Sequence, residues 1–277
     1  VVSGDTHRIA TLEQQMNEVY TDTARDTFGA KAASARPQLD SYRLYVSADA
    51  LYWKAFEGGK DYASKTDRSV IPMEGSSKRV DFEWMWGFRT ELGYRTAHDG
   101  WDLAAHYTWF FDKGDSEISA PSSGAITPLF YTPEETYGLY AESHASLHFQ
   151  EGDLSLQKSY FLSPNFSLTW AAALRSSWIN QTSKASSYAP RRGVGRPTRW
   201  IEQHGENDFW GIGPKIGFAP KWFVDKNWHF FGSFAGSLLY GEFDVRIRNE
   251  VNGVIPPKAF RADLHQISPT IQGALGV

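Results

Sequence analysis

The chain has 277 residues, of which 22% are charged and 41% hydrophobic, and its formal net charge is −4. This balance excludes a disordered chain, and no apolar run reaches the ~18 residues of a membrane-spanning helix. The charge excludes an overall basic field for nucleic acid, and the lack of cysteine excludes disulfides and zinc–thiolate sites. Aromatic residues make up 15%, with 11 Trp and 13 Tyr, an abundance typical of membrane barrels with aromatic girdles.

Residues 1–40 are predicted to form a short helix and a linker. Within Thr6–Ala24, apolar residues recur every three or four positions, as on one face of a helix; they are Ile9, Leu12, Met16 and Val19. The segment fits either a solvated amphipathic helix or a short trimerising or cell-wall-facing stalk, and Pro37 favours a linker after it. The first ten residues show no signal-peptide pattern, so we expect such a peptide to be lacking or already removed.

Two neighbouring segments, Val80–Arg95 and Trp101–Asp112, alternate apolar and polar residues. In the first, most even positions are aromatic and most odd positions are charged or glycine. Because successive side chains of a strand point to opposite faces, each segment has one aromatic face and one polar face. The short segment Thr96–Gly100 between them predicts a β-hairpin.

Similar patterns predict eight strands along the chain. They are Leu44–Phe56, Val80–Arg95, Trp101–Asp112, Ala141–Phe161, Phe166–Asn180, Asp208–Trp222, Trp228–Val245 and Phe260–Val277. Long polar loops are predicted at Glu57–Arg79, Lys113–Tyr140 and Gln181–Asn207, and they alternate with short turns. Within Ala141–Phe161 the apolar positions change from odd to even, which predicts a β-bulge near Glu151–Asp153.

This alternation of long and short connections is the plan of outer-membrane barrels, with short periplasmic turns and longer external loops. The predicted strands are also longer than the roughly 5–6 residues usual in soluble sheets, and their extra length would project beyond the bilayer. We therefore predict an all-β, antiparallel transmembrane β-barrel of at least eight strands over residues 41–277. The N-terminal helix would lie in the periplasm, and a soluble β protein is the remaining alternative.

Several phrases resemble the Legionella-type major outer membrane protein family, whose members form pores and also occur in chlamydia-like bacteria. They are Ala48–Ala55 (ADALYWKA), Trp86–Tyr94 (WGFRTELGY), His98–Leu103 (HDGWDL), Tyr107–Phe110 (YTWF) and Gly211–Lys215 (GIGPK). The resemblance runs from about Leu44 to the end and implies a porin-like barrel in a Gram-negative outer membrane. Barrels of this kind usually end in an aromatic strand, whereas this chain ends in Ala274–Val277. We therefore expect the sequence to be C-terminally incomplete and eight strands to be a lower bound.

The alternation divides the candidate residues between the two faces of the barrel wall. Candidates for the lumen are Asp49, Asp81, Glu83, Arg89, Glu91, Arg95, Asp102, His106, Glu142, His144, Arg175 and Lys215. Candidates for the lipid face are Phe82, Trp84, Trp86, Phe88, Trp101 and Trp109. Charged groups in a wet lumen set ion selectivity, but the same residues would also serve as salt-bridged struts.

Arg191, Arg192, Arg196 and Arg199 form a basic cluster in the third long loop. It fits a solvated loop, an anion constriction or a contact with lipopolysaccharide phosphates. Neither a catalytic constellation nor a metal-ligand motif is identifiable, so no enzyme activity, cofactor or metal is expected.

The predicted function is passive diffusion of ions and small hydrophilic solutes through the bacterial outer membrane. The alternative is a non-conducting structural or adhesive barrel that acts through its long external loops. The expected partners are outer-membrane lipids and lipopolysaccharide, the diffusing solutes, and other copies of the chain in a homo-oligomer.

Overall fold

The computed structural model describes residues 43–67, 75–96, 100–120, 124–130, 138–163, 165–189, 199–225, 228–251 and 255–277. The N-terminal helix predicted within residues 1–40 lies outside this part of the chain. Every regular element in the described ranges is a β-strand, and no helix there is long and apolar enough to cross a membrane.

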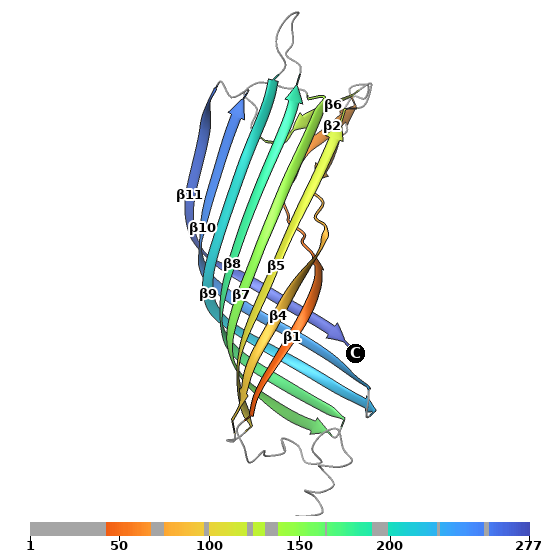
Figure 1. Cartoon of the computed structure of the whole chain (residues 1–277), viewed down its shortest axis with the longest axis vertical. Coiled ribbons are helices and arrows are strands. Elements are labelled where there is room, and N and C mark those ends of the chain that lie inside the picture. Colours follow the sequence, from red (N-terminus) through yellow and green to blue (C-terminus); the bar gives the residue numbers. More distant parts are fainter. Residues whose placement is uncertain are drawn as a thin grey trace, which may run out of the picture.

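Eight of these strands form one antiparallel sheet in the order β1-β4-β5-β7-β8-β9-β10-β11. Their bounds are β1 Arg43–Lys54, β4 Trp84–Arg95, β5 Trp101–Ser119, β7 Tyr140–Ser163, β8 Phe166–Ala189, β9 Arg199–Asp225, β10 Trp228–Val251 and β11 Ile255–Gly276. The predicted all-β antiparallel fold is thus confirmed. Each strand is tilted relative to the long axis of the molecule (Figure 1).

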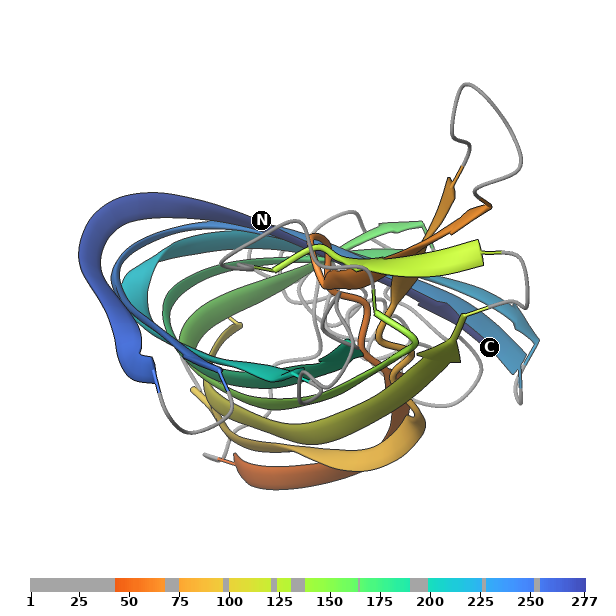
Figure 2. The same cartoon turned by 90° about the horizontal axis from the view of Figure 1, so that it is seen from above.

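The sheet is strongly curved, with one concave and one convex face (Figure 2). Within the described residues, no hydrogen-bonded pairing joins β1 to β11, which lie at the two ends of the strand order. The described strands therefore form a curled wall that is open along one side.

The convex face is apolar over the half of each strand that lies nearest the short turns. On β8, for example, Leu168, Trp170, Ala172, Leu174 and Trp178 point outward. The 12 steps from Phe166 to Trp178, at about 3.3 Å each and a tilt of about 45°, give a height of roughly 28 Å. This height suits the ~25 Å apolar band of a membrane barrel, and beyond it the outward side chains become polar.

Two segments that the sequence predicts to be loops fold into a second sheet at the other end of the long strands. This three-stranded sheet has the order β3-β2-β6, formed by Gly75–Arg79, Asp61–Asp67 and Gly124–Pro128. The loop predictions for Glu57–Arg79 and Lys113–Tyr140 were therefore wrong in part, and β5 also runs on to Ser119. Likewise, β8 and β9 extend through most of the loop predicted at Gln181–Asn207.

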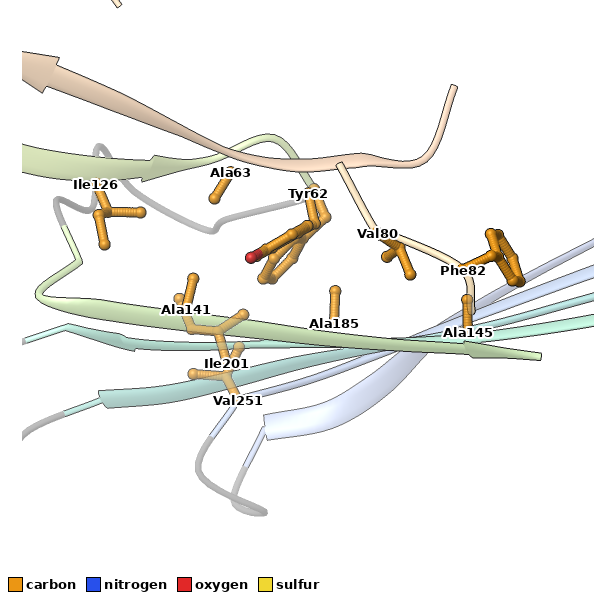
Figure 3. Close-up of a cluster of buried hydrophobic side chains, with 11 residues drawn as sticks. Tyr62, Ala63, Val80, Phe82, Ile126, Ala141, Ala145, Ala185, Ile201 and Val251 are labelled. Carbon is orange, nitrogen blue, oxygen red and sulfur yellow. The ribbon is translucent and has the colours of Figure 1, made fainter. Parts of the chain in front are cut away.

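The small sheet packs against the concave face through a hydrophobic cluster (Figure 3). The cluster consists of Tyr62, Ala63, Val80, Phe82, Ile126, Phe130, Ala141, Ala145, Ala185, Ile201 and Val251. These short strands contain too few apolar residues to show the alternating pattern that predicts a strand from sequence. They are recognised only in the structure, where they contact the long strands. Because the cluster lies on the concave face, it closes off part of the interior at this end.

Gly114 on β5 allows the chain before β4 to approach the sheet closely. A Cβ atom at this position would lie 2.7 Å from the backbone oxygen of Asp81 and 2.9 Å from the Val80 side chain. Phe82 forms an isolated bridge with Gly114, and regular pairing resumes only at β4. Because strand pairing is interrupted between Phe82 and β4, the side chains of Val80 and Phe82 point into the hydrophobic cluster. Those of Trp84 and Trp86 point outward.

The β-bulge predicted near Glu151–Asp153 is wrong. β7 pairs with β5 from Trp101↔Lys158 to Ser119↔Tyr140 without a register shift. The odd residues of β7 consequently face the concave side along the whole strand, from Ala141 in the cluster to Ser155. Leu147 and Phe149, whose apolar character suggested a phase change, point inward, and Leu147 packs against the cluster.

Candidate functional site on the concave face

Eight of the twelve lumen candidates lie on the concave face of the sheet. They are Asp49 on β1, Arg89, Glu91 and Arg95 on β4, Asp102 and His106 on β5, Arg175 on β8 and Lys215 on β9. They face the interior because each occupies a position of the same parity as the buried residues of its strand or, for Asp49, stands in register with the inward Arg89. The concave face therefore carries mixed acids and bases beyond the hydrophobic cluster.

Acidic residues stand opposite basic ones or histidine in neighbouring strands near the β1 side of the sheet. Asp49 is in register with Arg89, Glu91 with His106, and Arg95 with Asp102. The Nε2 atom of His106 lies 4.0 Å from Glu91 Oε1. Cross-strand pairs of opposite charge stabilise an antiparallel sheet modestly, by about 0.2–1 kcal/mol each, where the charged groups meet. Among the described residues, the charged groups of Asp49 and Arg89 do not come within 4.0 Å of each other.

Arg175 is the centre of a buried network of charges. Its side chain is only 1% exposed, and its Nε and Nη2 atoms donate to Asp153 Oδ1 and Oδ2 at 2.7 and 2.8 Å. Arg175 Nη2 also lies 2.9 Å from Glu151 Oε1, and Lys215 Nζ donates to Asp153 Oδ2 at 2.6 Å. Two cations thus hold two carboxylates that burial alone would strongly destabilise.

Gln272 extends this network across the interior. It belongs to β11, yet its Oε1 accepts a hydrogen bond from Arg175 on β8 at 2.8 Å. Its Nε2 donates to Glu151 on β7 at 3.0 Å. These bonds join strands that are three and four places apart in the sheet, so the curl brings side chains from distant strands together. Where this network lies along the strands, its polar side chains fill part of the space inside the curved sheet.

Glu151, Asp153 and Gln272 are members of the network that the sequence pattern does not predict. The two carboxylates lie where the pattern predicts a bulge, and Gln272 is an uncharged residue in the last strand. A single odd–even alternation kept along β7 would have placed Glu151 and Asp153 on the inner face. No comparable signal marks Gln272, because its role depends on the curvature of the whole sheet.

Two lumen candidates on β7 were wrong. Glu142 and His144 occupy even positions and lie on the convex face, the same face as Leu154 and Leu156. The correction follows from the continuous register of β7, which leaves only odd positions on the inside. His144 Nδ1 lies 2.6 Å from Asp115 Oδ1 there, and both side chains are more than half exposed.

Three candidates just before β4 also need correction. Phe82, predicted to face lipid, is 4% exposed within the hydrophobic cluster. Asp81 and Glu83, predicted to face the lumen, flank Phe82 and are exposed, because the neighbours of an inward side chain in an extended segment point to the opposite side. Asp81 Oδ1 accepts a hydrogen bond from Lys54 Nζ at 2.7 Å, and this bond, together with the positive charge, lowers the pKa of Asp81. The irregular backbone before β4 explains all three differences.

The remaining aromatic candidates point outward from the sheet. Trp84, Trp86 and Phe88 are exposed on β4, and Trp101 and Trp109 of β5 share their face through the β4–β5 register. Of the basic loop cluster, Arg191, Arg192 and Arg196 lie outside the described residues, and Arg199 is the first residue of β9.

A comparison with protein families connects this architecture to a known group. Residues 37–277 match the model of the Legionella pneumophila major outer membrane protein precursor. The chain belongs to this family. It is therefore an outer membrane protein, as the resemblance implied, and the predicted localisation in the bacterial outer membrane is confirmed. No curated protein and no solved structure matches the chain.

Family membership explains why a sheet of this kind exposes its aromatic side chains. In this outer membrane protein, the convex apolar band is the surface suited to hydrocarbon, because alternate residues of a membrane strand face lipid. The charged residues of the concave face are then kept away from lipid by the same alternation.

Proposed function

We propose that this outer membrane protein forms a channel for passive diffusion of ions and small hydrophilic solutes. The observation that carries the proposal is the contrast between the faces of its strands, which are apolar outside and charged inside. A wall with charged residues on its inner side favours hydrated solutes over lipid, and the charged side chains bias which ions enter.

The alternative is a non-conducting structural or adhesive barrel, and one feature of the structure favours it. The Arg175 network and the hydrophobic cluster both occupy the interior. Eight strands give an interior that side chains can fill, so this architecture is compatible with a wall that passes nothing. Copies of the chain in a homo-oligomer and lipopolysaccharide around it are partners that suit either function.

Reconstitution in planar lipid bilayers distinguishes the two functions. We expect discrete, reproducible conductance steps from protein that is folded according to its heat-modifiable mobility in electrophoresis. Folded protein that inserts and remains silent over repeated trials would contradict the channel and favour the structural barrel. Heat-denatured protein at the same detergent concentration is the control for leakage.

A further inference from the structure

The concave face contains a cavity of about 470 Å³ beside the Arg175 network. Its floor is made of small residues on β8 to β11, among them Ala171, Gly217 and Ala235. Polar side chains from β4, β5 and β7 line its other side, including Arg89, Thr108 and Gln157. The cavity therefore has one polar side and one side of small apolar residues, and it lies on the path that a diffusing solute would take in the proposed channel.

The carboxylates that line this cavity are already bound by cations. Asp153 is held by Arg175 and Lys215, and Glu151 by Arg175 and Gln272. The side chains of Glu151 and Asp153 are only 8% and 5% exposed. A solute in the cavity consequently finds little free negative charge on these two groups.

Arg89 differs from the other cations of this region. Among the described residues, no carboxylate lies within 4.0 Å of its guanidinium, although Asp49 stands opposite it in the ladder. Its Nε donates to Thr108 Oγ1 at 3.2 Å, and its Cζ lies 5.7 Å from the centre of the Trp53 ring. These two contacts orient the guanidinium plane without neutralising its charge.

Among the described residues that line the cavity, Arg89 is the charged side chain without an ion pair. Lys215 is bound by Asp153, and both Asp153 and Glu151 are bound by Arg175, which lies buried behind them. Glu91, the next inward residue of β4, accepts hydrogen bonds from Tyr45 and Ser47.

We propose that Arg89 forms an oxyanion-binding site in this cavity, for a small solute that carries a carboxylate or a phosphate group. A guanidinium held by its Nε and by an aromatic ring presents its remaining N–H groups as a planar fork, which matches two oxygens of an oxyanion. The inference deepens the proposed channel by giving its interior a preferred class of solute, but binding at this site does not itself require conduction.

Isothermal titration calorimetry of the full chain, folded in detergent micelles, tests the site directly. Succinate and inorganic phosphate are titrated separately, which shows whether carboxylates, phosphates or both are bound. We expect saturable binding that weakens roughly tenfold or more in Arg89→Gln, because a charged hydrogen-bonding partner is lost. Arg89→Lys keeps the charge but loses the fork, and we expect it to bind more weakly than the natural chain as well.

Arg248→Gln is the matched control. It removes one positive charge from the outer face of the sheet, near the C-terminal end of β10 and away from the cavity. It should bind both anions as the natural chain does, and heat-modifiable mobility verifies that each variant is folded. Absence of saturable binding for both anions, or equal weakening in Arg248→Gln and Arg89→Gln, overturns the site. Conductance without anion binding refutes only this inference, whereas binding without conductance refutes only the proposed channel.

Discussion

Arg175 shows how one side chain can determine the stability of the interior. It is 1% exposed and is the common partner of Asp153, Glu151 and Gln272. A buried charge network of this kind adds little net stability compared with apolar residues, but removing one member leaves unpaired charges behind. The alternation of residues in the sequence predicts Arg175 as a lumen residue, whereas its partners depend on the strand register and on the curvature of the sheet.

Replacing Arg175 with Met should destabilise the protein strongly. The substitution keeps much of the side-chain volume but leaves two carboxylates without their main cation, at a cost on the order of 3–5 kcal/mol. Urea unfolding of the folded protein in detergent micelles, followed by tryptophan fluorescence, measures the loss. The exposed pair of Arg248 with Glu250 provides the control, since Arg248→Gln should change stability by less than about 1 kcal/mol. Equal unfolding midpoints for Arg175→Met and the natural chain would falsify the central role of Arg175.

At the scale of the elements, the small sheet is the largest departure from what the sequence suggested. Asp112 of β5 anchors the segment that connects β1 to the small sheet. Its carboxylate is fully buried and accepts a hydrogen bond from the backbone N–H of Ala55 at 2.7 Å, which fixes the chain where it leaves β1. Together with the cluster around Tyr62 and Ile126, this contact makes the small sheet a packed element of the fold.

Introducing a charge into the cluster should detach the small sheet while the long strands remain paired. Ile126 of β6 is fully buried, so Ile126→Asp places a carboxylate among apolar side chains at a cost of several kcal/mol. We expect faster proteolysis within residues 57–79 and, if the small sheet restricts the channel, a larger conductance step. Lys65 is exposed on β2 of the same sheet, and Lys65→Asp should alter neither property. Unchanged proteolysis in Ile126→Asp is the result that contradicts this assignment.

At the scale of the whole molecule, the strands divide into a membrane part and a projecting part. The outward side chains of β8 are apolar from Phe166 to Trp178 and polar from Asn180 to Lys184. β9 shows the same division, with Trp210 on the apolar side and Asp208 on the polar side. The strands are therefore longer than a bilayer requires, and the small sheet packs inside their projecting end.

Two substitutions on the outer face of β8 test this placement. Leu174 lies near the middle of the apolar band and Thr182 lies beyond it, and both side chains are exposed on the same face. Arginine near the midplane of a bilayer costs about 2–4 kcal/mol but only about 0–1 kcal/mol near the interface. Leu174→Arg should therefore reduce the folded fraction in lipid vesicles, whereas Thr182→Arg should fold almost as the natural chain does. Equal folding of both variants is incompatible with a membrane boundary between these positions.

The sequence by itself determined the strand class, the antiparallel hairpins and the two faces of most strands. It did so because side chains alternate with a period of two, and membrane strands display that period over unusual lengths. Its failure at Phe82 came from the irregular backbone before β4, and its failure on β7 at Glu142 and His144 came from judging the phase by apolarity alone. The inward Leu147 is apolar because it packs against the hydrophobic cluster under the second sheet, and not because it faces lipid.

Only the tertiary structure decided which charges meet and what covers the concave face. Gln272 reaches Glu151 across four neighbouring strand pairs, and such a contact depends on the curvature of the whole sheet. The small sheet is likewise formed from short strands that become stable only against the long ones, since their apolar surface is too small to form a core alone. Periodicity is a local property of the chain, whereas curvature and packing are properties of the assembled sheet.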